Sequence, residues 1–503
     1  MIVLATLNAR YIHASLGLRY LFANMGELEA DTDIMEFIIG DRPADIVEKL
    51  LAKSPRIIGL GVYIWNAEET LKVVELLKQV APEIKVVLGG PEVSHECEEQ
   101  AIVALADHVI CGPGDLAFAA LCRDILKGEA APRIIRPEMP DLKDIALPYR
   151  LYTDHDIAHR LIYVEASRGC PFKCEFCLSA LDKTAWPYEL ERFLAEMDAL
   201  YRRGARHFKF VDRTFNLNVK ASLRILEFFL ERLDETLFLH FEVIPDHLPD
   251  PLKEALARFP EGSLQLEIGV QTFDPEVQSL ISRRQDNDKT AANLRWLREH
   301  TGAHIHADLI AGLPGEDLTS FALGFDRLVK LDPQEIQVGI LKRLRGAPIA
   351  RHTVTADMHY SPHPPYTVVR TGRLDFATLQ RINRYARYWD LVGNSGRFSV
   401  TRPLLLSDTP FERFMAFSDW LYATTGKTHQ LALDRLYDWV YRWLTEQGGV
   451  PAEAAHEAVA ADFHASGTRS IPPFLQATTA PIPPRIKSDP GHAPKRQARH
   501  LAD

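Results

Sequence analysis

Short apolar runs alternate with stretches of helical periodicity in the first part of the chain. The apolar runs cover residues 2–7, 32–38, 56–62, 84–88 and 107–111. Helical patterns fall between them, for example at residues 67–80 and 98–106. Continuous apolar strands that alternate with helices are typical of a parallel sheet covered on both faces. We therefore predict a doubly wound α/β domain of the flavodoxin or Rossmann kind over residues 1–136, followed by a linker at 137–155.

A second series of strands begins near residue 161. Its strand candidates are residues 161–166, 207–212, 237–244, 264–270, 304–310 and 335–341. Helical patterns between them include residues 188–203, 221–233 and 318–330. Six strand–helix units fit a partial (βα)₆ TIM-like barrel, because a full eight-unit barrel needs about 250 residues. We place this barrel at residues 156–348.

The pattern changes again after the sixth of these strands. Residues 358–367 carry several Pro and His residues, which indicates a connecting loop, and residues 374–391 and 411–443 show aromatic-rich helical periodicity. We predict an α-helical domain at residues 349–471. The remainder, residues 472–503, is rich in Pro, Ala, Thr and basic residues, a composition typical of disorder.

Composition and charge give no support for a nucleic-acid-binding, membrane-bound or secreted protein. The chain has 503 residues, 25% charged residues and a formal net charge of −10, without a basic block that would favour nucleic-acid or membrane binding. No apolar run reaches the ~18 residues of a membrane span. The start of the sequence lacks the basic residues and cleavage site of a secretory signal. We expect a cytoplasmic protein without a membrane span.

Three of the six cysteines, Cys170, Cys174 and Cys177, lie within eight residues directly after the first strand of the second series. Thiolates are soft ligands that suit iron–sulfur centres. Three of them leave one iron of a cubane cluster open to a small chelating ligand. Structural zinc, a disulfide or buried thiols are the alternatives, but zinc sites bring a second Cys pair or His ligands, and no second pair occurs here.

The Cys-x₃-Cys-x₂-Cys spacing at the first strand end of a partial barrel resembles the radical SAM superfamily. The resemblance implies a 4Fe-4S cluster whose open iron chelates S-adenosylmethionine, and one electron, from a donor such as flavodoxin or ferredoxin, cleaves the sulfonium to a 5′-deoxyadenosyl radical. It also implies S-adenosylmethionine contacts by Phe176, Asp212, Glu242, Glu267, Gln271 and Asp308. Each carboxylate in or beside an apolar strand has the alternative of a structural ion pair.

Glycine-rich loops follow the third, fourth and fifth strands of the first domain. Glycines at consecutive strand ends let a flat or phosphorylated ligand approach the backbone. The Gly-x-Gly-x-x-Gly pattern of dinucleotide-binding domains is missing. Joined to the barrel, the loops resemble the cobalamin-binding branch of the superfamily. The implied cobalamin residues are Asn8, His13, Tyr63, Trp65, Asn66, Gly89, Gly90, Pro91, Glu92, Gly112 and Gly114. The Asp-x-His-x-x-Gly motif is absent, so either His13 ligates cobalt or no protein histidine does, with Tyr63 or Trp65 near its lower face.

The resemblance implies a radical methyltransferase that transfers a methyl group from cobalamin to an unactivated carbon. Alternatives are a cobalamin-dependent rearrangement or cyclase reaction, resembling the anaerobic Mg-protoporphyrin ester cyclases, and a non-catalytic cobalamin-binding protein. A methylthiotransferase would need a second cluster on Cys97, Cys111 and Cys122, whose spacing does not fit. The substrate has no recognisable signature. Lys342, Arg343 and Arg345 either meet an anionic substrate or form a solvated charge run.

Overall fold

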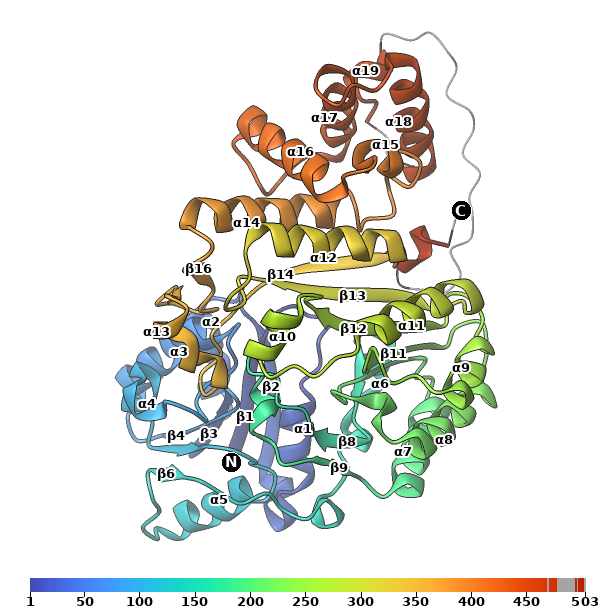
Figure 1. The fold of residues 1–503 in the computed structure, drawn as a ribbon. Helices are drawn as coiled ribbons and strands as arrows, with labels where there is room; N and C mark the ends of the chain where they lie inside the picture. The colour runs from blue at the N-terminus through green and yellow to red at the C-terminus, as the bar shows by residue number, and fades with distance from the viewer. Residues whose placement is uncertain (468–469, 477–493, 495, 502–503) are drawn as a thin grey trace. The chain divides into compact units, whose positions relative to one another are not determined.

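The computed structural model describes residues 1–467, 470–476, 494 and 496–501 (Figure 1). The chain divides into two compact units. The first comprises Met1–Arg213, Lys342–Ala350 and Ser361–Thr367. The second comprises Thr214–Leu341, Arg351–Tyr360 and Val368–Asp503.

A parallel sheet with the strand order β2-β1-β3-β4-β5-β6 forms the core of the first unit. Its strands are β1 (Ile2–Asn8), β2 (Thr32–Ile38), β3 (Ile57–Gly61), β4 (Lys85–Gly89), β5 (His108–Ile110) and β6 (Ile134–Ile135). The order of the first five strands is that of flavodoxin-like proteins. The doubly wound fold predicted from the sequence is therefore confirmed.

Helices cover both faces of this sheet because alternate residues of each strand point to opposite sides. Val3, Ala5 and Leu7 belong to one apolar core, which the helices α2 (Pro43–Leu51), α3 (Ala67–Val80) and α4 (Ala101–Leu105) complete. Ile2 and Leu4 belong to a second core with α1 (Leu16–Ala23) and α5 (Ala117–Lys127). All seven residues of β1 are buried, as expected for a strand covered on both sides.

Two local predictions for this domain need correction. The apolar pattern predicts five strands for this domain, but residues 134–135 contribute a sixth, because Val109 N donates to Arg133 O at 2.7 Å and Cys111 N donates to Ile135 O at 2.8 Å. The helix predicted at residues 98–106 is split into the 3₁₀ turn η2 (Cys97–Glu99) and α4. The split falls at Gln100, whose extended backbone interrupts the helix and whose side chain donates to the Glu92 and His95 carbonyls.

The first two strands of the second series also lie in the first unit. β7 (Ile162–Val164) and β10 (His207–Phe210) are parallel, and α7 (Leu190–Arg202) lies between them in the chain. An antiparallel hairpin of β8 (Ser167–Gly169) and β9 (Ala185–Pro187) follows β7. Shorter elements of this unit are η1 (Gly26–Asp31), η3 (Leu142–Asp144), η4 (Tyr149–Leu151), α6 (Asp154–His159) and η5 (Leu178–Leu181).

The remaining four strands of the series form a parallel sheet in the second unit, in the order β11-β12-β13-β14. They are β11 (Phe238–Val243), β12 (Leu264–Gln271), β13 (His304–Ala311) and β14 (Glu335–Ile340). The helices around them are η6 (Phe215–Leu217), α8 (Val219–Leu230), α9 (Asp250–Ala257), α10 (Pro275–Leu280), α11 (Asn287–His300) and α12 (Leu318–Leu331). The predicted strand–helix alternation is confirmed for all six strands.

The chain beyond the barrel strands is mainly helical, as predicted. Its helices are α13 (His352–Thr355), α14 (Phe376–Leu391), α15 (Arg402–Leu406), α16 (Pro410–Thr425), α17 (Leu433–Glu446) and α18 (Ala452–Ser466). The single periodic stretch predicted at residues 411–443 is two helices, because Gly426 with φ +63° ends α16 in a left-handed cap. The predicted loop at 358–367 contains β15 (His359–Tyr360), which pairs with β16 (Val368–Arg370).

Parts of the stretch predicted to be disordered, residues 472–503, are ordered in the structure. α19 (Pro473–Gln476) is held by Phe474, whose ring stacks on Tyr441 with centroids 4.7 Å apart. The 3₁₀ turn η8 (Gln497–Arg499) is held by Arg496, whose Nη2 lies 2.8 Å from Glu335 Oε2. For residues 477–493, 495 and 502–503 the prediction lies outside the described residues. Among the described helices, none has the length and apolar character that crossing a bilayer requires.

Candidate active site

The three clustered cysteines lie in the loop between β8 and β9 of the first unit. Cys170 is buried, whereas Cys174 and Cys177 are half-buried, and none of the three is part of a disulfide. Cys177 N donates to Cys174 O at 3.0 Å, which keeps the last two in one turn. Burial raises the pKa of Cys170, and the nearby Cys177 and Cys174 raise it further. Phe176, predicted to pack on adenine, is half-buried in the same turn.

The hairpin around this loop requires a glycine immediately before the first cysteine. Gly169 has φ +85°, and a Cβ there would lie 2.5 Å from Thr184 O and 2.8 Å from the Trp186 ring. Lys173 closes the loop from within, because its Nζ donates to Ala180 O at 3.0 Å. The backbone therefore holds three thiols in one compact turn, an arrangement suited to three irons of a cubane cluster.

Asp212 ties the end of β10 to the start of the cysteine loop. Its carboxylate accepts from Ala166 N at 2.9 Å and from Ser167 Oγ at 2.6 Å. Burial raises the pKa of Asp212 to about 7, although these hydrogen bonds oppose the shift. The sequence predicts a contact from this residue to S-adenosylmethionine. In the structure, both carboxylate oxygens of Asp212 accept hydrogen bonds from the segment that leads to Cys170.

The other three cysteines do not gather into a second site. Cys97 and Cys111 belong to the core on one face of the sheet, and Cys122 belongs to the core on the opposite face. Burial raises the pKa of Cys111 and that of Cys122 to about 12, so both remain thiols at neutral pH. This separation argues against the methylthiotransferase alternative.

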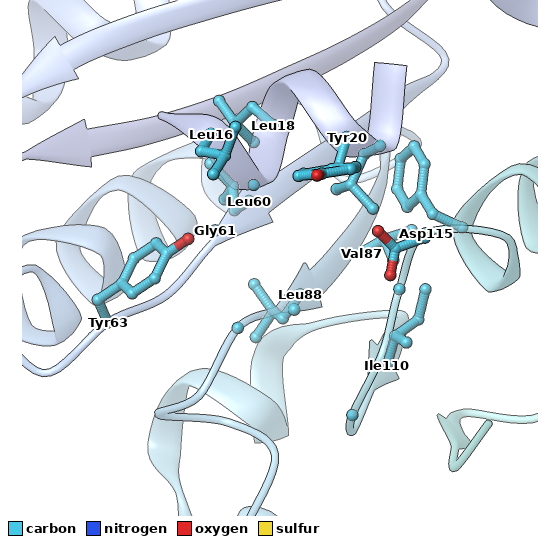
Figure 2. A pocket seen from close by; sticks show the side chains of 18 of the residues that line it. Leu16, Leu18, Tyr20, Leu60, Gly61, Tyr63, Val87, Leu88, Ile110 and Asp115 are labelled. Atoms are coloured by element: carbon cyan, nitrogen blue, oxygen red, sulfur yellow. The ribbon is translucent and has the colours of Figure 1, made fainter. Parts of the chain in front are cut away.

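A pocket of about 320 Å³ opens at the carboxyl edge of the first sheet (Figure 2). Its apolar lining comes from both the sheet and the helices beside it. It includes Leu16, Leu18, Leu21, Leu60, Val87, Leu88, Ile110 and Phe118. A glycine at position 90 (φ +107°) lets the loop after β4 lie against the Val62 backbone, because a Cβ there would lie 2.4 Å from Val62 O. Such a pocket suits a large, flat ligand that contacts the backbone.

Five of the predicted cobalamin residues line this pocket. They are Tyr63, Gly89, Gly90, Gly112 and Gly114. The remaining six, Asn8, His13, Trp65, Asn66, Pro91 and Glu92, are not among the lining residues. The residues of α1 that line the pocket, such as Leu16 and Tyr20, were missed by sequence reasoning because nothing in an apolar helix distinguishes a pocket wall from a core.

Tyr63 is held in place by Trp65 and Asn66. The Tyr63 and Trp65 rings stack with centroids 4.4 Å apart and an interplanar angle of 9°, and Trp65 is 48% exposed. Asn66 Oδ1 accepts from Tyr63 N at 2.7 Å, and its amide donates to Leu7 O at 3.0 Å. Asn66 therefore acts on the pocket through Tyr63, whose hydroxyl Figure 2 shows directed into it.

His13 makes its contacts outside the pocket lining. Its Nδ1 lies 2.6 Å from Tyr163 Oη, and its backbone forms a bridge with Leu161. Burial lowers the pKa of His13, and the positive charges of Lys209 and Arg10 lower it further. Asn8 donates to His13 O at 2.9 Å and fixes this turn. These contacts favour the prediction without a histidine ligand to cobalt.

Arg168 connects the cysteine loop to the pocket. It lies in β8, two residues before Cys170, and it also lines the pocket. Its guanidinium contacts Asp115 Oδ2 at 2.9 Å and Glu165 Oε1 at 2.7 Å, and it lies over the Tyr20 ring, 4.4 Å from the centroid. Asp115 and Glu165 also line the pocket. Sequence reasoning missed this group, since Arg168 and Asp115 are 53 residues apart in the chain.

Four predicted S-adenosylmethionine residues lie on three neighbouring strands of the second unit. Glu242 is in β11, Glu267 and Gln271 are in β12, and Asp308 is in β13. The strand register pairs Glu242 with Glu267 and Gly269 with Asp308. A register shift between Gly269 and Gln271 changes the direction of the chain there, and Gln271 has φ +69°. The parallel register thus brings predicted residues from separate motifs side by side.

Two histidines contact these carboxylates. His240 Nε2 lies 2.9 Å from Glu267 Oε2, and His306 Nε2 lies 3.3 Å from Asp308 Oδ1. Burial lowers the pKa of His306, but Asp308, Glu335 and Glu267 outweigh burial and raise it to about 8. Sequence reasoning missed both histidines, although the alternation of His304, His306 and Asp308 along an apolar strand was a usable signal.

Comparison with known families assigns the two regions. Residues 164–322 match the radical SAM superfamily, and residues 2–122 match the B12-binding domain. Residues 356–487 match a family described as a protein of unknown function (DUF4080). The first match contains the three-cysteine loop, and the second contains all the strand-end glycines of the pocket.

Individual proteins agree with this assignment. The chain is 26% identical over 328 residues to an uncharacterized methyltransferase of Pyrococcus horikoshii, covering 60% of this chain and 70% of that protein. It is 25% identical over 333 residues to the cobalamin-dependent radical SAM methyltransferase TokK of Streptomyces tokunonensis, covering 59% of this chain and 48% of TokK. The chain has a fold similar to that of OxsB, a cobalamin-dependent S-adenosylmethionine radical enzyme whose structure was solved with aqua-cobalamin and S-adenosylmethionine bound. The TM-score is 0.60 at 13% sequence identity, and the match covers 93% of this chain and 84% of OxsB.

These matches confirm the cofactors that the sequence resemblance implied: a 4Fe-4S cluster, S-adenosylmethionine and cobalamin. The residues present fit them, since three cysteines outside any disulfide share one loop and the strand-end glycines of the pocket lie in the matched B12-binding region. The chain therefore combines an amino-terminal B12-binding domain with a radical SAM domain.

Proposed function

We propose that this chain is a cobalamin-dependent radical SAM methyltransferase that methylates an unactivated carbon of its substrate. The observation that carries the proposal is the contact of Arg168 with Asp115 and Glu165, because it joins the cysteine loop and the pocket within one unit. The names of the relatives support methylation over the alternative rearrangement or cyclase chemistry.

Each part of the site has a proposed role. Cys170, Cys174 and Cys177 hold the cluster, and Gly89, Gly90, Gly112, Gly114 and Tyr63 form the wall that receives cobalamin. The cluster supplies the electron that cleaves S-adenosylmethionine, and cobalamin carries the methyl group. Tyr63 covers one face of the pocket with an aromatic ring that is braced by Trp65.

Asp212 has a positioning role in this proposal. It accepts two hydrogen bonds from Ala166 and Ser167, so it holds the entry to the cysteine loop at a fixed distance from β10. Phe176, Glu242, Glu267, Gln271 and Asp308 remain the predicted contacts of S-adenosylmethionine. The histidines His240 and His306 orient Glu267 and Asp308 through their ring nitrogens.

The cellular setting follows from the same chemistry. Six cysteines without a disulfide and an oxygen-sensitive cluster suit a reducing compartment, so we place the protein in the cytoplasm. A flavodoxin or ferredoxin is the proposed electron donor, because the cluster must be reduced before each cleavage of S-adenosylmethionine.

Product analysis under anaerobic conditions tests the proposed function. The protein is reconstituted with iron and sulfide, reduced and supplied with S-adenosylmethionine, and 5′-deoxyadenosine and S-adenosylhomocysteine are quantified with and without cobalamin. Formation of both products, with S-adenosylhomocysteine only in the presence of cobalamin, supports methyl transfer. Formation of 5′-deoxyadenosine alone favours the rearrangement or cyclase alternative. Absence of both products from protein with an intact cluster contradicts the proposal.

A further inference from the structure

Two stretches from beyond the barrel strands belong to the same unit as the B12-binding domain. Lys342 and Thr367 form an antiparallel bridge, and Arg343 N donates to Tyr366 O at 3.0 Å. Residues 342–350 and 361–367 are therefore connected to one another. Tyr366 falls within the match to the family of unknown function, which starts at residue 356. Part of that family region thus belongs to the unit that contains the pocket.

These stretches donate hydrogen bonds to the buried carboxylate of Glu92, which lies in the loop after β4. Glu92 is 4% exposed, and its Oε1 accepts from Tyr366 Oη at 2.6 Å and from Arg345 Nε at 2.9 Å. Arg345 Nη2 also donates to Tyr366 Oη at 3.0 Å, so the three side chains form a closed triangle. Burial raises the pKa of Tyr366 to about 12, and Glu92 contributes, so the hydroxyl keeps its proton. A buried carboxylate is costly unless such donors satisfy it.

A second carboxylate in the same loop is bound in a similar way. Glu96 accepts from Arg343 Nη2 at 2.8 Å, from Arg345 Nη1 at 3.3 Å and from Gly346 N at 3.3 Å. Gly346 has φ +81°, and a Cβ there would lie 2.4 Å from His95 Cγ, so the two segments approach closely. Two residues of the charge run predicted to be solvated or to meet an anionic substrate, Arg343 and Arg345, are therefore paired with acidic residues of this loop.

Backbone hydrogen bonds connect Glu92 to residues that line the pocket. Glu92 N donates to Val62 O at 3.4 Å, and Val62 N donates to Gly89 O at 2.8 Å. Gly89 and Gly90 line the pocket, and Val62 precedes Tyr63, which lines it as well. Tyr366, Arg345 and Glu92 do not line the pocket themselves. A shift of Glu92 would nevertheless move both the glycine loop and the aromatic wall.

We propose that Glu92, Arg345 and Tyr366 are positioning residues of the cobalamin site, which they hold in its binding conformation by fixing the loop after β4. The inference deepens the proposed function and rests on it. It gives a role in cofactor binding to a tyrosine that lies 274 residues away from Glu92 in the chain.

The test is an anaerobic equilibrium-dialysis titration of cluster-loaded protein with hydroxocobalamin. Tyr366→Phe removes one hydroxyl and keeps the ring, and we expect the Kd for cobalamin to rise about tenfold, equivalent to about 1.4 kcal/mol. His363→Gln is the matched control, because His363 is exposed in the same stretch and its ring forms a loose, exposed ion pair with Glu68 at 3.7 Å. The control should bind cobalamin like the wild type.

Further readouts separate positioning from loss of folding. Tyr366→Phe should retain the iron content and the electron paramagnetic resonance signal of the reduced cluster. Combined with Glu92→Gln, which replaces the charged acceptor with a neutral one, it should weaken binding by less than the product of the two single effects, since both substitutions weaken the same contact. Arg343→Gln, at a half-buried position, serves as a second variant and should raise the Kd several-fold.

A Kd within twofold of the wild type in both Tyr366→Phe and Arg343→Gln would overturn the inference. That result is distinguishable from failure of the proposed function, in which the wild type binds cobalamin but forms no S-adenosylhomocysteine, or binds no cobalamin at all.

Discussion

The guanidinium of Arg168 lies 2.9 Å from the carboxylate of Asp115, which joins the strand that leads to Cys170 to the loop after β5. Both side chains are largely buried, at 16% and 8% side-chain exposure. Arg168 and Asp115 both line the pocket, and Arg168 lies two residues before Cys170. A substitution at either residue should therefore affect both the cysteine loop and the pocket.

Arg168→Gln should destabilise the first unit. The substitution leaves Asp115 and Glu165 as buried carboxylates without their cation, which costs about 3 kcal/mol. Denaturant unfolding of the cofactor-free protein, followed by circular dichroism, measures the loss. Arg123→Gln is the matched control, because Arg123 forms an exposed pair with Glu27 and its removal should leave the unfolding midpoint unchanged. Equal midpoints for the two variants would contradict a structural role of Arg168.

Gly90→Ala should abolish cobalamin binding. The added Cβ would lie 2.4 Å from Val62 O, and φ +107° is unfavourable for alanine. Gly128→Ala is the control, since Gly128 also has positive φ (+76°) but has no atom within 4 Å of an added Cβ. Both variants should lose about 1 kcal/mol of stability from the backbone. Only Gly90→Ala should lose cobalamin in a spectroscopic titration, and retention by both would place the cofactor elsewhere.

Cys174→Ala should remove cluster-dependent chemistry. Two thiolates cannot hold the cubane cluster in this loop, so formation of 5′-deoxyadenosine should fall to background. Cys122→Ala changes a buried thiol in the core formed with α5 and should keep both the cluster spectrum and the product. If Cys174→Ala still cleaved S-adenosylmethionine, the assignment of the cluster ligands would be wrong.

His306 should make the stability of the second unit depend on pH. Its pKa is raised to about 8 by Asp308, Glu335 and Glu267, against an unfolded value of 6.5. The protonated ring therefore stabilises the fold fully below pH 6.5, and this contribution is lost as the pH rises through 8. The difference is roughly 2 kcal/mol at full loss.

Comparison with His306→Gln isolates this effect from other titrations. The free energy of unfolding of the wild type, minus that of the variant, should decrease between pH 6.5 and 9. A difference that is constant over this range would show that these carboxylates do not stabilise the protonated His306 ring.

The sequence alone was sufficient for features that arise within short stretches. The strand–helix alternation identified both sheets, and the spacing of Cys170, Cys174 and Cys177 identified the cluster loop. It was insufficient for contacts between distant residues. Arg345 and Glu92 are 253 residues apart, and neither has a neighbour in the sequence that indicates the pairing.

Local context also does not show which contacts a predicted site residue makes within the protein. Asn66 and Trp65 occur at a strand end rich in glycine, yet one fixes a turn and the other braces Tyr63. Asp212 follows a strand like a ligand-binding carboxylate, but its hydrogen bonds go to Ala166 and Ser167. A strand end marks where a site lies, and only the packing decides which side chains face it.

The most direct test of the central claim is the metal content of the anaerobically reconstituted wild type after gel filtration. If one chain holds both a cluster on its cysteine loop and cobalamin in its pocket, elemental analysis should find about four iron atoms and about one cobalt atom per chain in the same fraction. Iron without cobalt after incubation with excess cobalamin, or cobalt without iron, would contradict the account.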